Sequence, residues 1–216
     1  MKRFFKNRVN KTLTPEKNQM SLFHLAWPIF VESILMMLVG NVDQYMVASY
    51  SENSVGAIGN ANQIINLLLI MFSMISVATT ILVSHYIGSK NTEKLPVLYT
   101  LSVTFNLIFS FTIAVIIFLF SNQIFNFMSL PNEILADAIT YLKLVGGFIF
   151  LQGLIGTFSA IFRANKMMKE NMVVSISINV FNVIFNIFLI NGFGPIPALG
   201  VAGAASATII SRVAGV

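Results

Sequence analysis

The sequence predicts an all-α membrane protein with six transmembrane helices. Hydrophobic residues make up 56% of the 216-residue chain and charged residues only 10%, a composition that does not suit a water-exposed surface. The apolar residues form six segments, each able to hold about 20 residues at membrane depth. Lysine and arginine lie between these segments at alternate ends only, as expected when successive helices cross a bilayer.

The chain divides into a basic N-terminal segment, residues 1–20, and a six-helix transmembrane unit, residues 21–216. The N-terminal segment has no small-residue cleavage site, so we expect the first helix to be retained. The loops are short and turn-like, and none resembles a linker between domains. The last apolar segment reaches the end of the chain without a polar tail, and we expect the sixth helix to be truncated. We expect helices at residues 22–48, 55–87, 95–120, 134–162, 172–193 and 199–216.

The distribution of positive charge predicts the orientation in the membrane. Lysine and arginine precede the first apolar segment and follow the second and the fourth, whereas the alternate loops carry none. Because short basic loops are retained in the cytoplasm, we expect a multi-pass protein of the cytoplasmic membrane with a cytoplasmic N-terminus. The net charge of +5 then reflects topology and contact with the lipid bilayer. Nucleic acid is disfavoured as a partner, since no aromatic platform accompanies these dispersed charges.

Two carboxylates, Glu32 and Asp43, interrupt the first apolar segment. An aspartate near the centre of a spanning helix costs roughly 2.5 to 3.5 kcal/mol, so such residues usually face protein or a wet cavity. Eleven residues is almost three helical turns, which places both carboxylates on one face. Glu32 lies nearer the cytoplasmic end, where interfacial water could solvate it, so we regard it as an accessory polar residue. For Asp43 the alternative to a functional role is a structural hydrogen bond to a neighbouring helix.

The fifth segment carries a polar stripe. Ser175, Asn179, Asn182 and Asn186 fall within about 60° of one another when plotted at 100° per residue. Amide and hydroxyl oxygens, with a carboxylate from another helix, suit a small cation or can hold a proton-binding acid. Asparagine rows also hold helices together without transporting anything, so the structural alternative remains open.

Pro28 and the polar start of the second segment bear on how the helices move and pack. Pro28 removes a backbone hydrogen bond from the first helix and could form a hinge, or it could simply occupy the first helical turn. The second segment is polar between residues 53 and 66, so we expect this end to face protein or water. Interhelical hydrogen bonding is the interpretation we favour for its amides, which are Asn60, Asn62, Gln63 and Asn66.

The residues of the chain favour no enzymatic chemistry. There is no cysteine, which excludes disulfides and thiolate metal sites. The two histidines lie at helix ends without metal-ligand spacing, and no nucleophile is paired with a base. We therefore expect neither an enzyme nor a protein with a resident cofactor.

Three stretches of the chain resemble one known family. Residues 179–212 closely resemble the fifth and sixth helices of multidrug and toxic compound extrusion (MATE) transporters, above all in the Gly-Pro-x-Pro-Ala-Leu-Gly-Val-x-Gly-Ala-Ala motif of residues 194–205. Residues 42–47 resemble the first-helix Val-Asp motif of the family, and residues 85–89 resemble the end of its second helix. The resemblance extends in matching order from Ala26 to the end of the chain.

The resemblance implies an antiporter coupled to H⁺ or Na⁺ that exports amphipathic, often cationic, drugs or toxic compounds by alternating access. Such proteins have twelve helices in two six-helix lobes, and this chain looks like the first lobe only, so a second lobe is expected as its partner. The coupling ion, H⁺ or possibly bound Na⁺, would be held at Asp43, Asn182, Asn186 and Thr208, while Pro28 matches a first-helix proline. Many relatives carry aspartate where this chain has Asn186, which leaves tight sodium binding in question.

Two alternatives to a drug exporter remain. One is a lipid-linked saccharide flippase of the same superfamily, which would need a more cationic interior to meet pyrophosphate. We expect the inward-facing polar groups of this chain to be acidic or neutral, which favours a cationic cargo. The other alternative is a non-transporting half-subunit or truncated fragment, consistent with the missing second lobe.

Overall fold

The computed structural model describes residues 26–31, 33–34, 45–49, 51–192 and 197–216. Within these residues every regular element is helical and no strand occurs, which confirms the all-α prediction. The described residues of the expected first helix are helical. The elements that follow are α3 (Glu52–Gly88), η1 (Thr92–Lys94), α4 (Leu95–Phe127), α5 (Asn132–Tyr141), η2 (Leu142–Gly146), α6 (Phe150–Ala164), α7 (Met168–Ile190) and α8 (Gly200–Gly215).

Three of the described helices are long and apolar enough to cross a membrane. They cover Asn53–Gly88, Thr92–Phe127 and Met168–Ile190, with mean hydropathies of 2.3, 2.5 and 2.2. The pair Asn132–Gly146 and Phe150–Ala164 forms a fourth candidate span that is bent by 44°. The other two expected helices are α8, which has 16 residues, and the first helix, most of which lies outside the described residues.

The fourth expected helix is interrupted where the sequence predicts an unbroken one. α5 ends at Tyr141, the next five residues form the π-helical turn η2, and α6 begins at Phe150 after the bend. Sharp bends are typical of π-turns and of positions with small residues. Gly146 ends η2 and Gly147 follows it, and a side chain at Gly146 would overlap Ile117 of α4. The two glycines therefore allow the backbone at the end of η2 to lie close to α4.

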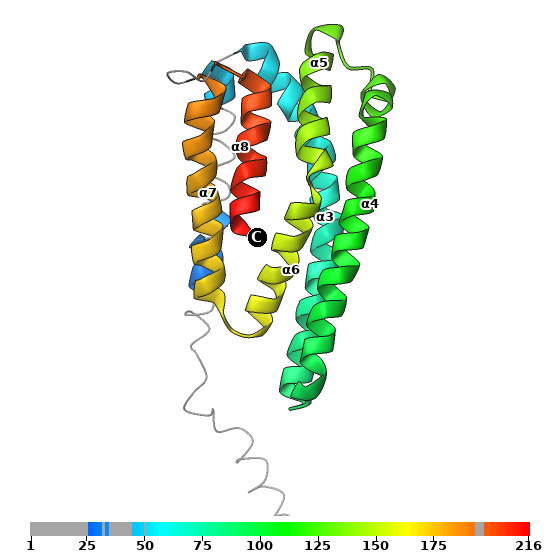
Figure 1. Cartoon of the computed structure of the whole chain (residues 1–216), viewed down its shortest axis with the longest axis vertical. Helices are drawn as coiled ribbons and strands as arrows, with labels where there is room; N and C mark the ends of the chain where they lie inside the picture. The colour runs from blue at the N-terminus through cyan, green and yellow to red at the C-terminus, as the bar shows by residue number, and fades with distance from the viewer. Residues whose placement is uncertain (1–25, 32, 35–44, 50, 193–196) are drawn as a thin grey trace, which may run out of the picture.

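The described helices surround an inner face between two groups (Figure 1). α3 and α4 run side by side with α5 and α6 along them, while α7 and α8 pair with each other. Small side chains allow the groups to meet, and the buried members of this core include Ala57, Ala61, Ala138, Ala204 and Ala205. The two groups of helices are therefore packed together through small side chains.

The outer faces of the long helices are apolar. Leu67 and Met74 of α3 and Phe105 and Ile108 of α4 are each more than half exposed, at 58% to 67%. A contiguous apolar surface of this kind would be unfavourable in water and suits contact with lipid chains. The helices thus present apolar groups outward and gather their polar groups inward.

Candidate functional site

Two asparagines of α7 form the buried centre of the candidate site. Asn182 and Asn186 are 6% and 1% exposed. Their four-residue spacing places them on one face of the helix, where Nδ2 of Asn186 donates to Oδ1 of Asn182 over 3.2 Å. These two residues of the predicted polar stripe therefore face the protein interior.

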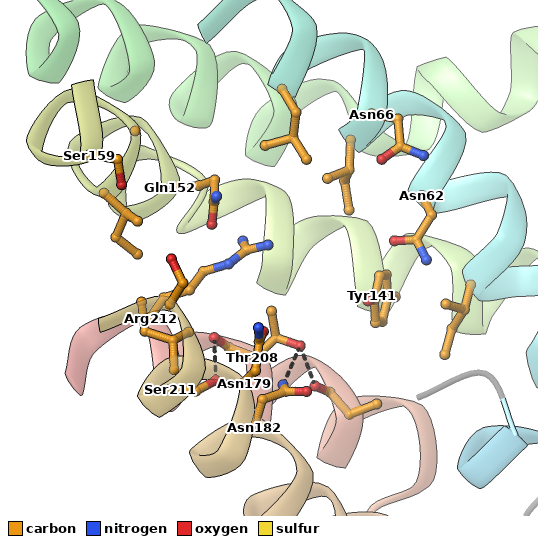
Figure 2. Close-up of a pocket in the computed structure, with 18 of the residues that line it drawn as sticks. Asn62, Asn66, Tyr141, Gln152, Ser159, Asn179, Asn182, Thr208, Ser211 and Arg212 are labelled. Atoms are coloured by element: carbon orange, nitrogen blue, oxygen red, sulfur yellow. Dashed lines mark hydrogen bonds between the residues drawn. The ribbon is translucent and has the colours of Figure 1, made fainter. Parts of the chain in front are cut away.

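Thr208 of α8 extends this hydrogen-bonded chain to a second helix. Nδ2 of Asn182 donates to Thr208 Oγ1 over 3.4 Å, and the threonine hydroxyl donates to the Ala204 carbonyl over 3.0 Å. Figure 2 shows Asn182 and Thr208 facing each other across the contact between α7 and α8. Three of the four residues expected to bind the coupling ion therefore meet in one place.

A glycine makes the contact between these two helices possible. A side chain at Gly203 of α8 would overlap the carbonyl oxygen of Leu189 in α7. Without a side chain at Gly203, the backbones approach closely enough for short side chains such as Asn182 and Thr208 to touch. The Gly-Ala-Ala part of the motif in residues 203–205 thus serves helix packing directly.

The predicted residues of the first helix are placed only in part. Asp43 and Glu32 lie outside the described residues. Val47, four positions after Asp43 in the sequence, is 2% exposed and lines the same cavity as Asn182. Pro28 is helical and buried, but residues 35–44 are not described, so the hinge at Pro28 stays a prediction.

A cavity of ≈ 480 Å³ lies between α3, α6, α7 and α8 (Figure 2). Ser175 and Asn179, the accessory residues of the polar stripe, line it beside Asn182 and Thr208. Apolar side chains complete the wall and include Ile58, Ile65, Leu69, Ile155 and Ile178. A mixed wall of this kind suits an amphipathic small molecule.

The polar residues of α3 divide between two environments. Asn62 and Asn66 line the cavity, which confirms that this end of the helix faces an interior space. Asn60 donates to the Gly56 carbonyl of its own helix over 2.9 Å. The interhelical hydrogen bonds that we favoured for these amides are absent from the described residues, so that interpretation is wrong there.

Two arginines of the cavity wall were not identified from the sequence. Arg163 lies in the last turn of α6 and Arg212 in the last turn of α8, and both line the cavity. The lining residues that the structure describes include no carboxylate, so the expectation of acidic or neutral inward-facing groups is wrong for this part of the chain. Helical spacing could have indicated both positions. Arg212 follows Thr208 by one turn, and Arg163 shares a face with Gln152 and Ser159.

A second buried polar cluster fixes α6 against α4, away from the cavity. Asn106 is fully buried, and its Nδ2 donates to the Gly153 carbonyl over 3.0 Å and to Thr157 Oγ1 over 2.6 Å. A side chain at Gly153 would lie within 2.8 Å of Ser110 Oγ. These contacts hold the start of α6 in place, and with it the cavity-lining face of that helix.

The chain is similar to a known protein family and to curated proteins. The family model MatE matches residues 28–188. An uncharacterized transporter of Bacillus subtilis, YisQ, is 40% identical over 201 residues, which is 93% of this chain and 44% of that protein. A probable multidrug resistance protein of Thermotoga maritima, NorM, is 31% identical over 212 residues, which is 98% of this chain and 45% of the relative. The chain thus spans less than half the length of these relatives.

The fold is similar to that of solved transporters. The structure of a multidrug resistance MATE family transporter of the MOP superfamily in its outward-facing conformation matches with a TM-score of 0.82 and 21% sequence identity. The match covers 88% of this chain and 42% of the solved one. At this level of identity the match establishes the fold alone.

Proposed function

This chain belongs to the MatE family of membrane transporters, and from that membership we propose that it is the N-terminal lobe of an antiporter that exports amphipathic drug-like molecules. Proteins of this family are integral membrane transporters and not enzymes. A relative that carries the name of a multidrug resistance protein supports drug export as the activity. Because the chain spans 44% and 45% of two relatives, the proposal includes a second lobe that completes the transporter.

One observation carries the proposal: the hydrogen-bonded chain from Asn186 through Asn182 to Thr208 borders a mixed polar and apolar cavity. Polar groups of transmembrane helices that face an interior cavity are typical of ion and substrate pathways. The cavity supplies space for a cargo, and the polar chain supplies oxygen atoms for a cation. Both parts of an ion-coupled exchange therefore lie in one lobe.

The coupling ion is proposed to be H⁺ or Na⁺, bound at Asp43 with the three uncharged residues of the site. The amide and hydroxyl oxygens of Asn182, Asn186 and Thr208 are hard ligands of the kind that Na⁺ accepts, and their hydrogen bonds also suit a protonated carboxyl. Antiport requires that the ion and the cargo stabilise different states of the lobe. A cation that neutralises Asp43 would change the preferred bend of the first helix, with Pro28 as the hinge.

The proposed location in the cell follows from the distribution of basic residues. We place the lobe in the cytoplasmic membrane with its N-terminus inside the cell, because the basic loops are then cytoplasmic. The end of α6, the α6–α7 connection and the start of α7 fall on that side, with Arg163, Lys166 and Lys169.

The proposal is tested by changing the one carboxylate assigned to the site. In the complete protein in vesicles, Asp43→Asn is expected to reduce efflux of a panel of amphipathic dyes, including ethidium, to background while leaving abundance unchanged. Sodium and pH gradients are imposed separately, so that the coupling ion is identified by the gradient that drives wild-type efflux. Asp137→Asn is the matched control, because Asp137 accepts a hydrogen bond from Ser54 over 2.9 Å and lies outside the cavity lining. Wild-type efflux by the Asp43 variant would contradict the proposal.

A lipid-linked saccharide flippase is the second candidate. The two arginines of the cavity wall favour it, since guanidinium groups bind pyrophosphate well. Translocation of a lipid-linked pyrophosphate by the complete protein, without efflux of any dye in the panel, would select this candidate over the drug exporter.

A further inference from the structure

The cavity carries positive charge in the part that its described residues define. Its charged lining residues are Arg163 and Arg212, which come from different helices. The remaining polar groups of the described wall are uncharged, and they include Asn62, Asn66 and Gln152. A positive cavity of this kind favours an anionic group on the molecule that enters it.

Arg163 has a buried hydrogen-bond donor that lacks an acceptor. Its Nε atom is buried and makes no hydrogen bond, and no ion pair joins this side chain to any residue that the structure describes. Leaving a charged donor buried without an acceptor is costly, and a ligand oxygen would satisfy it. Since Arg163 lies at the end of α6 and faces the cavity, the acceptor would come from within that space.

Arg212 brings a second guanidinium into the same space. Figure 2 shows its side chain extending from α8 across the cavity toward Gln152 of α6. Arg212 follows Thr208 by four residues, about 6 Å along the helix axis, so it borders the ion site without overlapping it. The planar guanidinium of arginine matches the two oxygens of a carboxylate, which lysine does not.

We infer that Arg163 and Arg212 form a binding site for the carboxylate of an amphipathic cargo. The inference rests on the proposed transport function, because it names the class of molecule that the same cavity carries. The apolar wall, with residues such as Ile155 and Ile178, holds the body of the cargo, while the two guanidiniums bind its anionic end. The cargo is therefore an anionic or zwitterionic amphiphile, and a purely cationic one binds more weakly.

The test uses two dyes that differ by one methyl group. Tetramethylrhodamine carries a free carboxylate, and its methyl ester carries none, while the rest of the molecule is the same. Binding to the complete protein, in nanodiscs of phosphatidylcholine, is measured by fluorescence anisotropy without any ion gradient. We expect the acid to bind about tenfold more tightly than the ester, in line with charge-assisted hydrogen bonds. Equal affinity of the two dyes would overturn the inference.

Variants of the two arginines test whether these residues cause the preference for the acid over the ester. Arg163→Gln and Arg212→Gln are each expected to remove most of the preference for the acid while changing the affinity for the ester less than twofold. Arg163→Lys and Arg212→Lys should retain part of it, which separates loss of charge from loss of folding. Lys169→Gln is the matched control, because Lys169 is an exposed residue of α7 outside the cavity lining. A preference for the acid that survives in both glutamine variants would overturn the assignment.

Two further measurements distinguish this inference from binding of a lipid and from the proposed ion coupling. Replacing part of the zwitterionic phosphatidylcholine with anionic phosphatidylglycerol tests whether an anionic lipid headgroup occupies the arginines. The acid preference should persist, and its loss would overturn the inference in favour of a lipid site. Asp43→Asn is expected to keep the acid preference in binding even when it stops efflux, so failure of the proposed ion coupling and failure of the carboxylate site give different results.

Discussion

Hydrogen bonds link three uncharged residues, Asn182, Asn186 and Thr208, and the stability of this hydrogen-bonded chain depends on each of them. Asn182 donates to Thr208 and accepts from Asn186, so removal of either neighbour removes one hydrogen bond from a buried amide. An unsatisfied buried polar group costs about 1–3 kcal/mol. Small changes in this chain should therefore affect ion binding strongly.

Replacing the threonine hydroxyl provides the sharpest test of this chain. We expect Thr208→Val to weaken binding of the coupling ion by about 1–3 kcal/mol, roughly five- to 150-fold, because the valine has the same shape without the hydroxyl. The concentration of ion that gives half-maximal efflux measures the effect. Thr208→Ser keeps the hydroxyl and should stay within a few-fold of wild type. Equal losses in both variants would point to packing and not to hydrogen bonding.

The sequence predicted the asparagines of this site but not its arginines, for a physical reason. Asn182 and Asn186 stand out because amides are costly in an apolar helix and their spacing matches one helix face. Arg163 lies in the last turn of a helix near a basic loop, where arginine is expected for topology alone. Helical spacing places Arg163 on one face with Gln152 and Ser159, but the sequence does not show that this face meets a cavity. Asp43, to which the proposed ion coupling is assigned, lies outside the described residues and stays a prediction.

The α7–α8 pair is the most closely packed element of the site. Gly203 lies directly against the backbone of Leu189, and small residues flank it along α8. Without a hydrophobic effect between helices in lipid, such close backbone approach supplies much of the attraction. The two helices are therefore expected to behave as one unit that keeps Asn182 and Thr208 together.

A single methyl group tests this packing. Gly203→Ala should destabilise the complete protein by about 1–3 kcal/mol, because the added carbon overlaps the Leu189 carbonyl and the helices must separate. Thermal unfolding in detergent should show a lower midpoint. Gly59→Ala in α3 is the control, since nothing lies within 4 Å of the added carbon and alanine favours a helix. An unchanged midpoint for the Gly203 variant would contradict the close contact.

Hydrophobic runs predicted most helices within a few residues, yet they could not reveal the bend in the fourth. α3 and α4 follow apolar segments bounded by polar turns, which the sequence shows directly. The π-turn η2 lies inside a run that is apolar throughout, so its composition resembles that of a straight helix. Gly146 and Gly147 mark the place, but glycine alone does not distinguish a bend from close packing.

The whole lobe presents lipid-compatible outer faces and a polar interior between two groups of helices (Figure 1). Its chain covers less than half of each relative described above, in keeping with one lobe of a two-lobed transporter. Under the proposed function, a second lobe would complete the wall of this cavity. The absence of cysteine from the 216 residues provides a practical route to the orientation, since introduced thiols have no native background in this lobe.

Single cysteines at two exposed asparagines report the orientation in intact cells. Asn132→Cys, at the start of α5, is expected to react with a membrane-impermeant maleimide from outside. Asn91→Cys, in the loop between α3 and η1, should react only after the membrane is permeabilised, because basic loops stay in the cytoplasm. Mass shift of the labelled protein measures both reactions. Labelling of residue 91 in intact cells would reverse the proposed orientation.

Because α6 is bent by 44° from the helix before it, a change of this angle would move the cavity-lining residues at the far end of α6. Arg163 lies thirteen residues beyond Phe150, about 20 Å from the pivot at 1.5 Å per residue. Opening or closing this angle by only 10° would swing the guanidinium through about 3 to 4 Å, which spans the difference between a hydrogen bond and none. A small change of the bend angle at η2, far from the cargo carboxylate, would thus make or break the hydrogen bond between Arg163 and an anionic cargo.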